Sequence, residues 1–133
     1  MINREAGIAI HQLMNKFEAQ DMSLLEHVAD NIDLAIEHYQ DETDVTWQQC
    51  TDKEGFVRVL GRLAEEVFPK GTNIVALSSE SLGEGWVITR LTQRFWYALM
   101  EQEVTGKSII ISHEHQHTVD YFREVVQSVE PMA

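Results

Sequence analysis

The sequence places a histidine where acid–base chemistry is favoured, at the end of a predicted strand. Apolar and polar residues alternate over residues 32–38, which predicts a strand with one buried face. An inward imidazole at this end could transfer a proton near neutral pH, with Tyr39 beside it as a second polar group. The alternative is a histidine that forms only a hydrogen bond at a pocket rim or in a loop. The side chains that share the buried face are Ile32, Leu34, Ile36 and His38.

Three further histidines recur at every second position near the C-terminus. His113, His115 and His117 would project from one face of a regular strand. Neutral imidazoles bind zinc, copper or iron, but they need a further ligand, and Glu114 would point to the opposite face. We therefore interpret the histidines as a polar patch rather than a metal site, with His115 near a bound ligand. Metal binding is the alternative.

Three helices are predicted in the first half of the chain. Residues 2–19 have apolar side chains at helical spacing, which gives one apolar stripe. Ser23 and Thr51 each precede a glutamate by three residues, and such capping boxes predict helix starts. The helix that Thr51 opens should run to Phe68 and carry Phe56 on its apolar face. The stripe of the first helix consists of Ile10, Leu13, Met14 and Phe17.

The rest of the chain is predicted to form strands, because β-branched and aromatic residues alternate with polar ones. Glycine-containing turns are expected at 83–85 and at 105–107, whereas no turn residues separate the last two strands. Strands are expected at 45–50, 73–82, 86–103 and 108–117, and residues 118–129 are expected to form a further strand or to continue the one before.

The strand predicted at 86–103 is apolar on both faces. Two tryptophans on the face that points away from the helices would not be stable in contact with water alone. We therefore predict that a second copy of the chain covers this outer face. The residues expected in this contact are Trp86, Arg90, Arg94 and Trp96.

Charge and composition exclude several classes of partner. The 133 residues include 22 acidic and 10 basic side chains, a formal net charge of −12. Such a surface repels phosphate groups, so neither nucleic acid nor a membrane is expected as a partner. Cys50 is the single cysteine and cannot form an internal disulfide. With no apolar run typical of a membrane span or a signal peptide, one cytoplasmic domain is expected over residues 1–133.

Helices early in the chain and long strands late are typical of α+β folds. Four segments resemble those of the nuclear-transport-factor-2-like superfamily, whose fold is also called cystatin-like, and in particular its SnoaL-like and ketosteroid-isomerase-like proteins. The resemblance covers nearly the whole chain and lies in layout rather than in an invariant motif. The segments are QDMSLLEHVADNIDLAIEHY (20–39), DKEGFVRVLGRLAEEVF (52–68), LGEGWVITRLTQRFW (82–96) and DYFREVV (120–126).

This resemblance implies an α+β fold, with N-terminal helices packed on a strongly curved antiparallel sheet that forms a cone with an internal pocket. It also implies a homodimer through the outer sheet face, and no cofactor. The superfamily includes isomerases, polyketide cyclases, dehydratases and non-catalytic binding proteins. The implied function is binding of a small apolar molecule, with proton transfer of the isomerase, cyclase or dehydratase kind. A non-catalytic dimeric interaction domain is the alternative.

The resemblance implies a site as well. In relatives whose first strand ends with an inward aspartate, that residue is the general base, and His38 takes its place here. The first helix has no tyrosine to act as an oxyanion donor, so steroid-type isomerisation is not expected. His38 and Tyr39 are thus the candidate catalytic residues. The candidate ligand-binding residues are Phe17, Trp47, Phe56 and His115.

Overall fold

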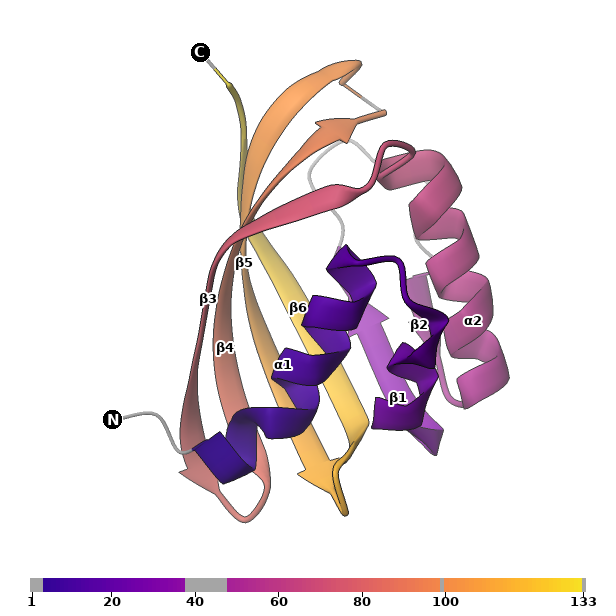
Figure 1. The fold of residues 1–133 in the computed structure, drawn as a ribbon, viewed down its shortest axis with the longest axis vertical. Coiled ribbons are helices and arrows are strands. Elements are labelled where there is room, and N and C mark those ends of the chain that lie inside the picture. The colour runs from indigo at the N-terminus through magenta and orange to yellow at the C-terminus, as the bar shows by residue number, and fades with distance from the viewer. Residues whose placement is uncertain (1–3, 38–47, 99, 133) are drawn as a thin grey trace.

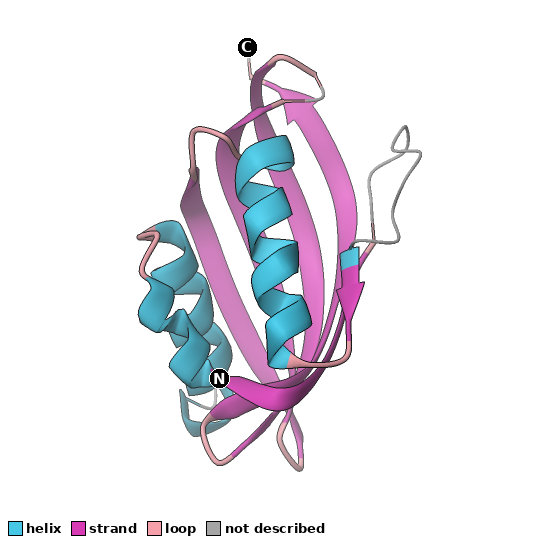
Figure 2. Ribbon diagram, turned by 90° about the vertical axis from the view of Figure 1, so that its right-hand side faces the viewer, coloured by secondary structure: helices cyan, strands magenta, loops and turns pink. Residues whose placement is uncertain are grey.

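The structure consists of a six-stranded curved sheet with helices on its concave face (Figures 1 and 2). The computed structural model describes residues 4–37, 48–98 and 100–132, with side chains from residue 9 onward. The predicted α+β class, with N-terminal helices on a curved sheet, is confirmed. The elements are α1 (Arg4–Glu18), η1 (Met22–His27), β1 (Val28–Ile36), β2 (Gln49–Cys50), α2 (Lys53–Arg62), η3 (Leu63–Val67), β3 (Thr72–Gly83), β4 (Trp86–Tyr97), β5 (Gln102–His115) and β6 (Thr118–Pro131).

The strands lie in the order β2-β1-β6-β5-β4-β3, and the sheet does not close into a barrel. β1 pairs with β6 in parallel, with Leu34 opposite Phe122. The other neighbouring strands are antiparallel, so the sheet is mixed rather than wholly antiparallel. Alternation within one strand indicates its buried face but carries no information about the direction of its neighbour.

The core forms where α1 and α2 pack against the inner face of the sheet. Ile10 and Leu13 of α1 and Phe56 of α2 are almost fully buried, and they meet Ile32 of β1 and Ile110 of β5 in one cluster. Complete burial of a large apolar side chain stabilises the fold by about 1.5–3 kcal/mol. The apolar stripe predicted for the first helix is therefore the face that holds α1 on the sheet.

The turn between β4 and β5 lies earlier than the sequence predicts. The chain reverses between Tyr97 and Gln102, which are register partners, and Glu101 adopts a positive φ of 51°. The prediction of a turn at residues 105–107 is wrong, since these residues lie within β5. A Cβ at Gly106 would lie 3.1 Å from a ring carbon of Phe95, so this glycine makes room for an aromatic ring.

The junction between the last two strands is a two-residue turn. Gln116 and His117 have positive φ values of 51° and 68°, the geometry of a type I′ hairpin turn. The Thr118 hydroxyl donates a hydrogen bond of 2.8 Å to the His115 carbonyl and stabilises the reversal. Glutamine and histidine are unusual at such positions, so no residue preference predicts this turn.

The helix starts differ from the predicted capping boxes by one or two residues. Asp21 caps η1, a 3₁₀ helix, by accepting a hydrogen bond of 2.9 Å from the Ser23 N–H. Asp52 caps α2 by accepting one of 2.6 Å from the Gly55 N–H. The predictions that Ser23 and Thr51 are the caps are therefore wrong. After Arg62 the last turn of this helical segment widens into the π-helical turn η3. Among the described helices, none combines the length and apolarity that a membrane crossing requires.

The cap at Asp52 gives a test of the fold with a matched control. We expect Asp52→Ala to lower the free energy of unfolding by about 1 kcal/mol, because the Gly55 N–H loses its acceptor. Thr51→Ala removes the neighbouring, exposed side chain and should cost much less. Urea unfolding followed by circular dichroism measures both. Equal losses in the two variants would contradict the assignment of the cap.

Candidate functional site

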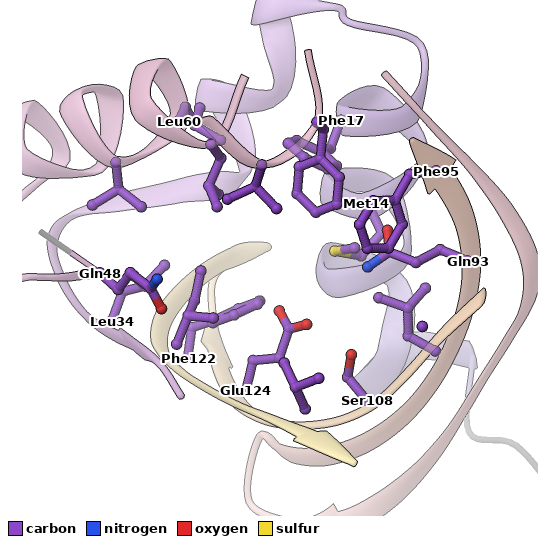
Figure 3. Close-up of a pocket in the computed structure, with 18 of the residues that line it drawn as sticks. Met14, Phe17, Leu34, Gln48, Leu60, Gln93, Phe95, Ser108, Phe122 and Glu124 are labelled. Atoms are coloured by element: carbon purple, nitrogen blue, oxygen red, sulfur yellow. The ribbon is translucent and has the colours of Figure 1, made fainter. Parts of the chain in front are cut away.

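A cavity of about 110 Å³ lies between the helices and the concave face of the sheet (Figure 3). α1 contributes Leu13, Met14 and Phe17, because these residues follow one another on its inward face. α2, η3 and the inner faces of β1, β4, β5 and β6 complete a lining that is mostly apolar. Apolar walls lower the local dielectric constant, so polar groups on this lining interact more strongly than they would on an open surface.

Glu124 places a carboxyl group inside this apolar cavity. Phe122, Glu124 and Val126 alternate along β6, so all three side chains line the cavity, and Figure 3 shows the Glu124 carboxyl pointing into it. The strand is fixed on both sides, since Glu124 lies opposite Ile110 of β5 and its carbonyl accepts a hydrogen bond of 2.8 Å from the Glu37 N–H. The carboxyl is therefore held by the centre of the sheet rather than by a loop.

The surroundings of Glu124 favour its protonated form. Burial raises the pKa of the Glu124 carboxyl above its ordinary value of 4.5, and a hydrogen bond from the Ser108 side chain opposes part of this rise. Ser108 lies on the neighbouring strand β5 and is itself buried. A carboxyl group whose pKa moves toward neutrality is a stronger base when ionised and a usable acid when protonated.

Gln93 brings an amide group to the same cavity. The Thr72 hydroxyl donates a hydrogen bond of 2.9 Å to the Gln93 side-chain oxygen, which fixes the amide plane. The amide end of Gln93 points toward the cavity (Figure 3), so its N–H₂ group is available as a donor at this end of the cavity. Gln48 and Tyr97 also line the cavity and are buried. The lining thus combines a titratable carboxyl group with hydrogen-bond donors.

Two of the residues predicted from the sequence to bind a ligand line this cavity, namely Phe17 and Phe56. His38, Tyr39 and Trp47 lie outside the described residues, so their predicted roles stay predictions. The alternation that motivated His38 is confirmed as far as it is described, because Leu34 and Ile36 of β1 both face the cavity. The sequence reading did not identify Glu124, Gln93 or Ser108.

The late histidines do not form the row that the sequence predicted. The ladder between β5 and β6 is irregular after His113, and His115 and His117 are exposed at the hairpin turn. His113 Nδ1 lies 2.7 Å from Asp120 Oδ1, and the His113 ring packs against Trp86 with their centroids 4.8 Å apart. His115 does not lie at the cavity lining, in contrast to its predicted role. Within the described part of the chain, no three potential ligands are grouped to hold a metal ion.

Glu114 follows His113 at the point where the pairing of β5 with β6 is irregular. Burial raises the pKa of its carboxyl, and a hydrogen bond from the Ala9 backbone opposes part of this rise. The group lies against α1 and does not line the cavity. We assign it a structural role at the end of the sheet.

The outer face of β4 carries the residues predicted to contact a second copy. Trp86, Arg90 and Arg94 are exposed, and Trp96 is half-buried. Lys70 Nζ lies 4.6 Å from the centroid of the Trp96 ring, so a cation covers part of this tryptophan.

Comparison of the sequence with protein-family models and with curated proteins gives no match. Comparison of the structure with solved structures gives many. An NTF2-like protein from Anabaena variabilis has a TM-score of 0.73 at 13% sequence identity, over 96% of this chain and 95% of the other. A candidate polyketide cyclase from Xanthomonas campestris has a TM-score of 0.71 at 11% identity, over 91% and 89%.

A third solved structure of the same shape is TerC co-crystallised with polyporic acid. It has a TM-score of 0.75 at 11% identity, over 92% of this chain and 91% of the other. The chain therefore has the nuclear-transport-factor-2-like fold, as its sequence resemblance predicted. Likeness at this level of identity establishes the fold and leaves the chemistry to be argued from the cavity.

The raised pKa of Glu124 predicts a pH dependence of stability. Because the pKa is higher in the folded than in the unfolded chain, the folded state binds the proton more tightly, and this contribution is complete below about pH 4.5. It is lost as the pH rises from 4.5 through the folded pKa, because the ionised carboxylate is desolvated. We therefore expect Glu124→Gln to gain stability relative to the wild type as the pH rises.

Urea unfolding at a series of pH values measures this difference. Glu130→Gln is the matched control, since Glu130 lies on the same strand and is exposed. A constant difference between wild type and Glu124→Gln across the pH range would show that the carboxyl is not desolvated.

Proposed function

We propose that the chain is a small-molecule enzyme that moves a proton on an apolar carbonyl compound, with Glu124 as the general base and acid. The observation that carries the proposal is the Glu124 carboxyl group, which points into a mostly apolar cavity from a strand fixed at both sides. Isomerase, cyclase and dehydratase reactions all include such a proton transfer. The proposed step is the proton transfer that these three kinds of reaction share.

The cavity suits each part of that step. The ionised Glu124 carboxylate would take a proton from the carbon next to a carbonyl group. The electron pair of that C–H bond would form a C=C bond, and the π pair of the carbonyl group would move to its oxygen. The Gln93 amide N–H is a suitable donor to the enolate oxygen that forms. Protonated Glu124 would then return the proton to a different carbon in an isomerisation, or to oxygen when a leaving group departs. The Ser108 hydroxyl holds the carboxyl in place.

The structural neighbours are in keeping with this proposal without defining the substrate. They include a candidate polyketide cyclase and a protein crystallised with polyporic acid. His38 remains a second candidate base, because it follows Glu37, whose N–H binds the Glu124 carbonyl. The same assay applied to His38→Ala tests that role.

Exchange of carbon-bound hydrogen for deuterium tests the proposed step without knowledge of the substrate. Cyclohexanone, cyclopentanone and acetophenone are incubated with the protein in deuterated water, and NMR follows the loss of the α-hydrogens. We expect exchange above the buffer rate, and a decrease of about a hundredfold or more in Glu124→Gln, because the base is removed. Glu130→Gln should retain the wild-type rate. Absence of exchange above the buffer rate with all three ketones would contradict the proposal.

We also propose that a second copy covers the outer face of the sheet. An apolar strip crosses three strands there, since Ile88 lies opposite Ile111, and Ile109 lies opposite Val125. Val125 is 44% exposed and Trp86 37%. Isologous contact between two such strips would bury both, which is the usual arrangement of a two-fold dimer.

Sedimentation velocity at micromolar concentration tests the dimer. We expect a dimer for the wild type and a monomer for Val125→Glu, because each interface would acquire two buried carboxylates. Val57→Glu is the control. Val57 is 40% exposed, close to the exposure of Val125, but it lies on α2, on the other side of the molecule. A monomeric wild type, or an unchanged dimer in Val125→Glu, would contradict this contact.

A further inference from the structure

The charge in the cavity has one sign. Glu124 points into it, the exposed Glu37 also lines it, and the remaining polar groups are amides and hydroxyls. Among the described residues that line the cavity, none is lysine, arginine or histidine. A bound anion would therefore meet carboxyl groups and no cation among these residues to balance it, which is costly on a mostly apolar lining.

One wall of the cavity is a continuous row of aromatic rings. Phe17 and Phe68 contact at a centroid distance of 5.9 Å, Phe68 and Phe95 at 4.6 Å, and Phe95 and Tyr97 at 5.6 Å. All four residues line the cavity. Aromatic rings attract cations through their quadrupole, and this attraction is strongest where water is excluded.

We propose that the cavity binds protonated apolar amines, with the Glu124 carboxylate as the counter-ion and the aromatic wall around the carbon frame, and that it excludes carboxylates. The proposal rests on the proposed function only in assigning the ligand to the same cavity and the same carboxyl group. It adds the charge that a ligand must carry. When the ligand is a neutral carbonyl compound, Glu124 exchanges a proton with carbon; when it is an ammonium ion, Glu124 pairs with it.

Pairing with an ammonium ion changes the protonation of the site in a way that can be measured. Burial raises the pKa of the Glu124 carboxyl, so without a ligand the group carries a proton below this raised pKa. An ammonium ion binds to the ionised form, so the Glu124 proton is released to the solvent and the ligand keeps its own. Binding should therefore release up to one proton per site below the folded pKa, and the affinity should rise with pH until Glu124 is ionised in the free protein.

Two further observations fit small cations. The cavity of about 110 Å³ is of the order of the ~150 Å³ apolar cavity that admits one benzene ring elsewhere, so a single six-membered ring is the appropriate frame. The net charge of −12 raises the local concentration of cations around the whole molecule and lowers that of anions.

Three ligands on one frame test the proposal. Cyclohexylamine is a cation at neutral pH, cyclohexanone is neutral, and cyclohexanecarboxylate is an anion of similar size. Isothermal titration calorimetry should give an affinity for the amine at least about tenfold higher than for the carboxylate, with the ketone between them. Titrations between about pH 5 and pH 8, in two buffers of different ionisation enthalpy, should show proton release for the amine and none for the ketone.

Two variants test whether the amine binds at Glu124. Glu124→Gln should lose at least about tenfold in affinity for cyclohexylamine and its proton release, while it still binds cyclohexanone, because the amide has a similar shape and no charge. Glu130→Gln, on the same strand but exposed, should bind all three ligands as the wild type does. Unchanged amine affinity in Glu124→Gln would show that the amine binds elsewhere on the acidic surface, and would overturn the proposal.

The results separate this inference from the proposed function. Amine binding with proton release but no deuterium exchange would support the charge selection and contradict the proton-transfer chemistry. Exchange that depends on Glu124, together with equal affinity for amine and carboxylate, would support the chemistry and overturn the charge selection. Loss of both would remove the cavity as a ligand site.

Discussion

Glu124 holds a carboxyl group inside a mostly apolar hollow, and this arrangement costs stability. Removing a carboxylate from water without a charged partner is unfavourable, and burial raises the pKa of the Glu124 carboxyl accordingly. A leucine at position 124 would avoid this desolvation. A polar group on a concave and mostly apolar lining is instead the arrangement that a binding or reaction site requires.

A rigid frame of paired strands holds the Glu124 carboxyl in this position. Glu124 lies between β1 and β5, in the centre of the sheet, and Ser108 fixes its carboxyl from the next strand. Gly106 leaves room for Phe95 on the inner face, and Thr72 fixes Gln93 across β3 and β4. Each of these groups lies on a strand rather than on a loop, so their relative positions are set by backbone pairing. The helices then close the hollow with apolar side chains.

Much of this frame could be predicted from periodicity. Apolar residues spaced three and four apart predicted the inward face of α1, and alternation of apolar and polar residues predicted the buried faces of β1 and β4. Turns were harder, because Gly106 marks close packing, while the chain reverses between Tyr97 and Gln102, where the sequence has no glycine, proline or asparagine. The parallel pairing of β1 with β6 brings together segments far apart in the sequence, and no local pattern indicates it.

The central residue of the site was missed for a definable reason. Along β6 the inward set of Phe122, Glu124 and Val126 alternates with an outward set that includes Tyr121 and Val125. Both sets are apolar with charges interspersed, so alternation alone does not indicate which face is inward. The charge of Glu124 within an apolar set was the available signal, and its meaning depended on the curvature that turns this face toward the hollow (Figure 3).

The pKa of Glu124 itself can be measured by NMR. Titration of the side-chain carboxyl carbons, with ¹³C-labelled glutamate, gives the midpoint of each group, and Glu124→Gln identifies the resonance by its absence. Because the carboxyl is desolvated, we expect a midpoint above the ordinary value of 4.5. A midpoint at or below 4.5 would mean that water reaches the group freely, and would contradict the description of an apolar site built around it.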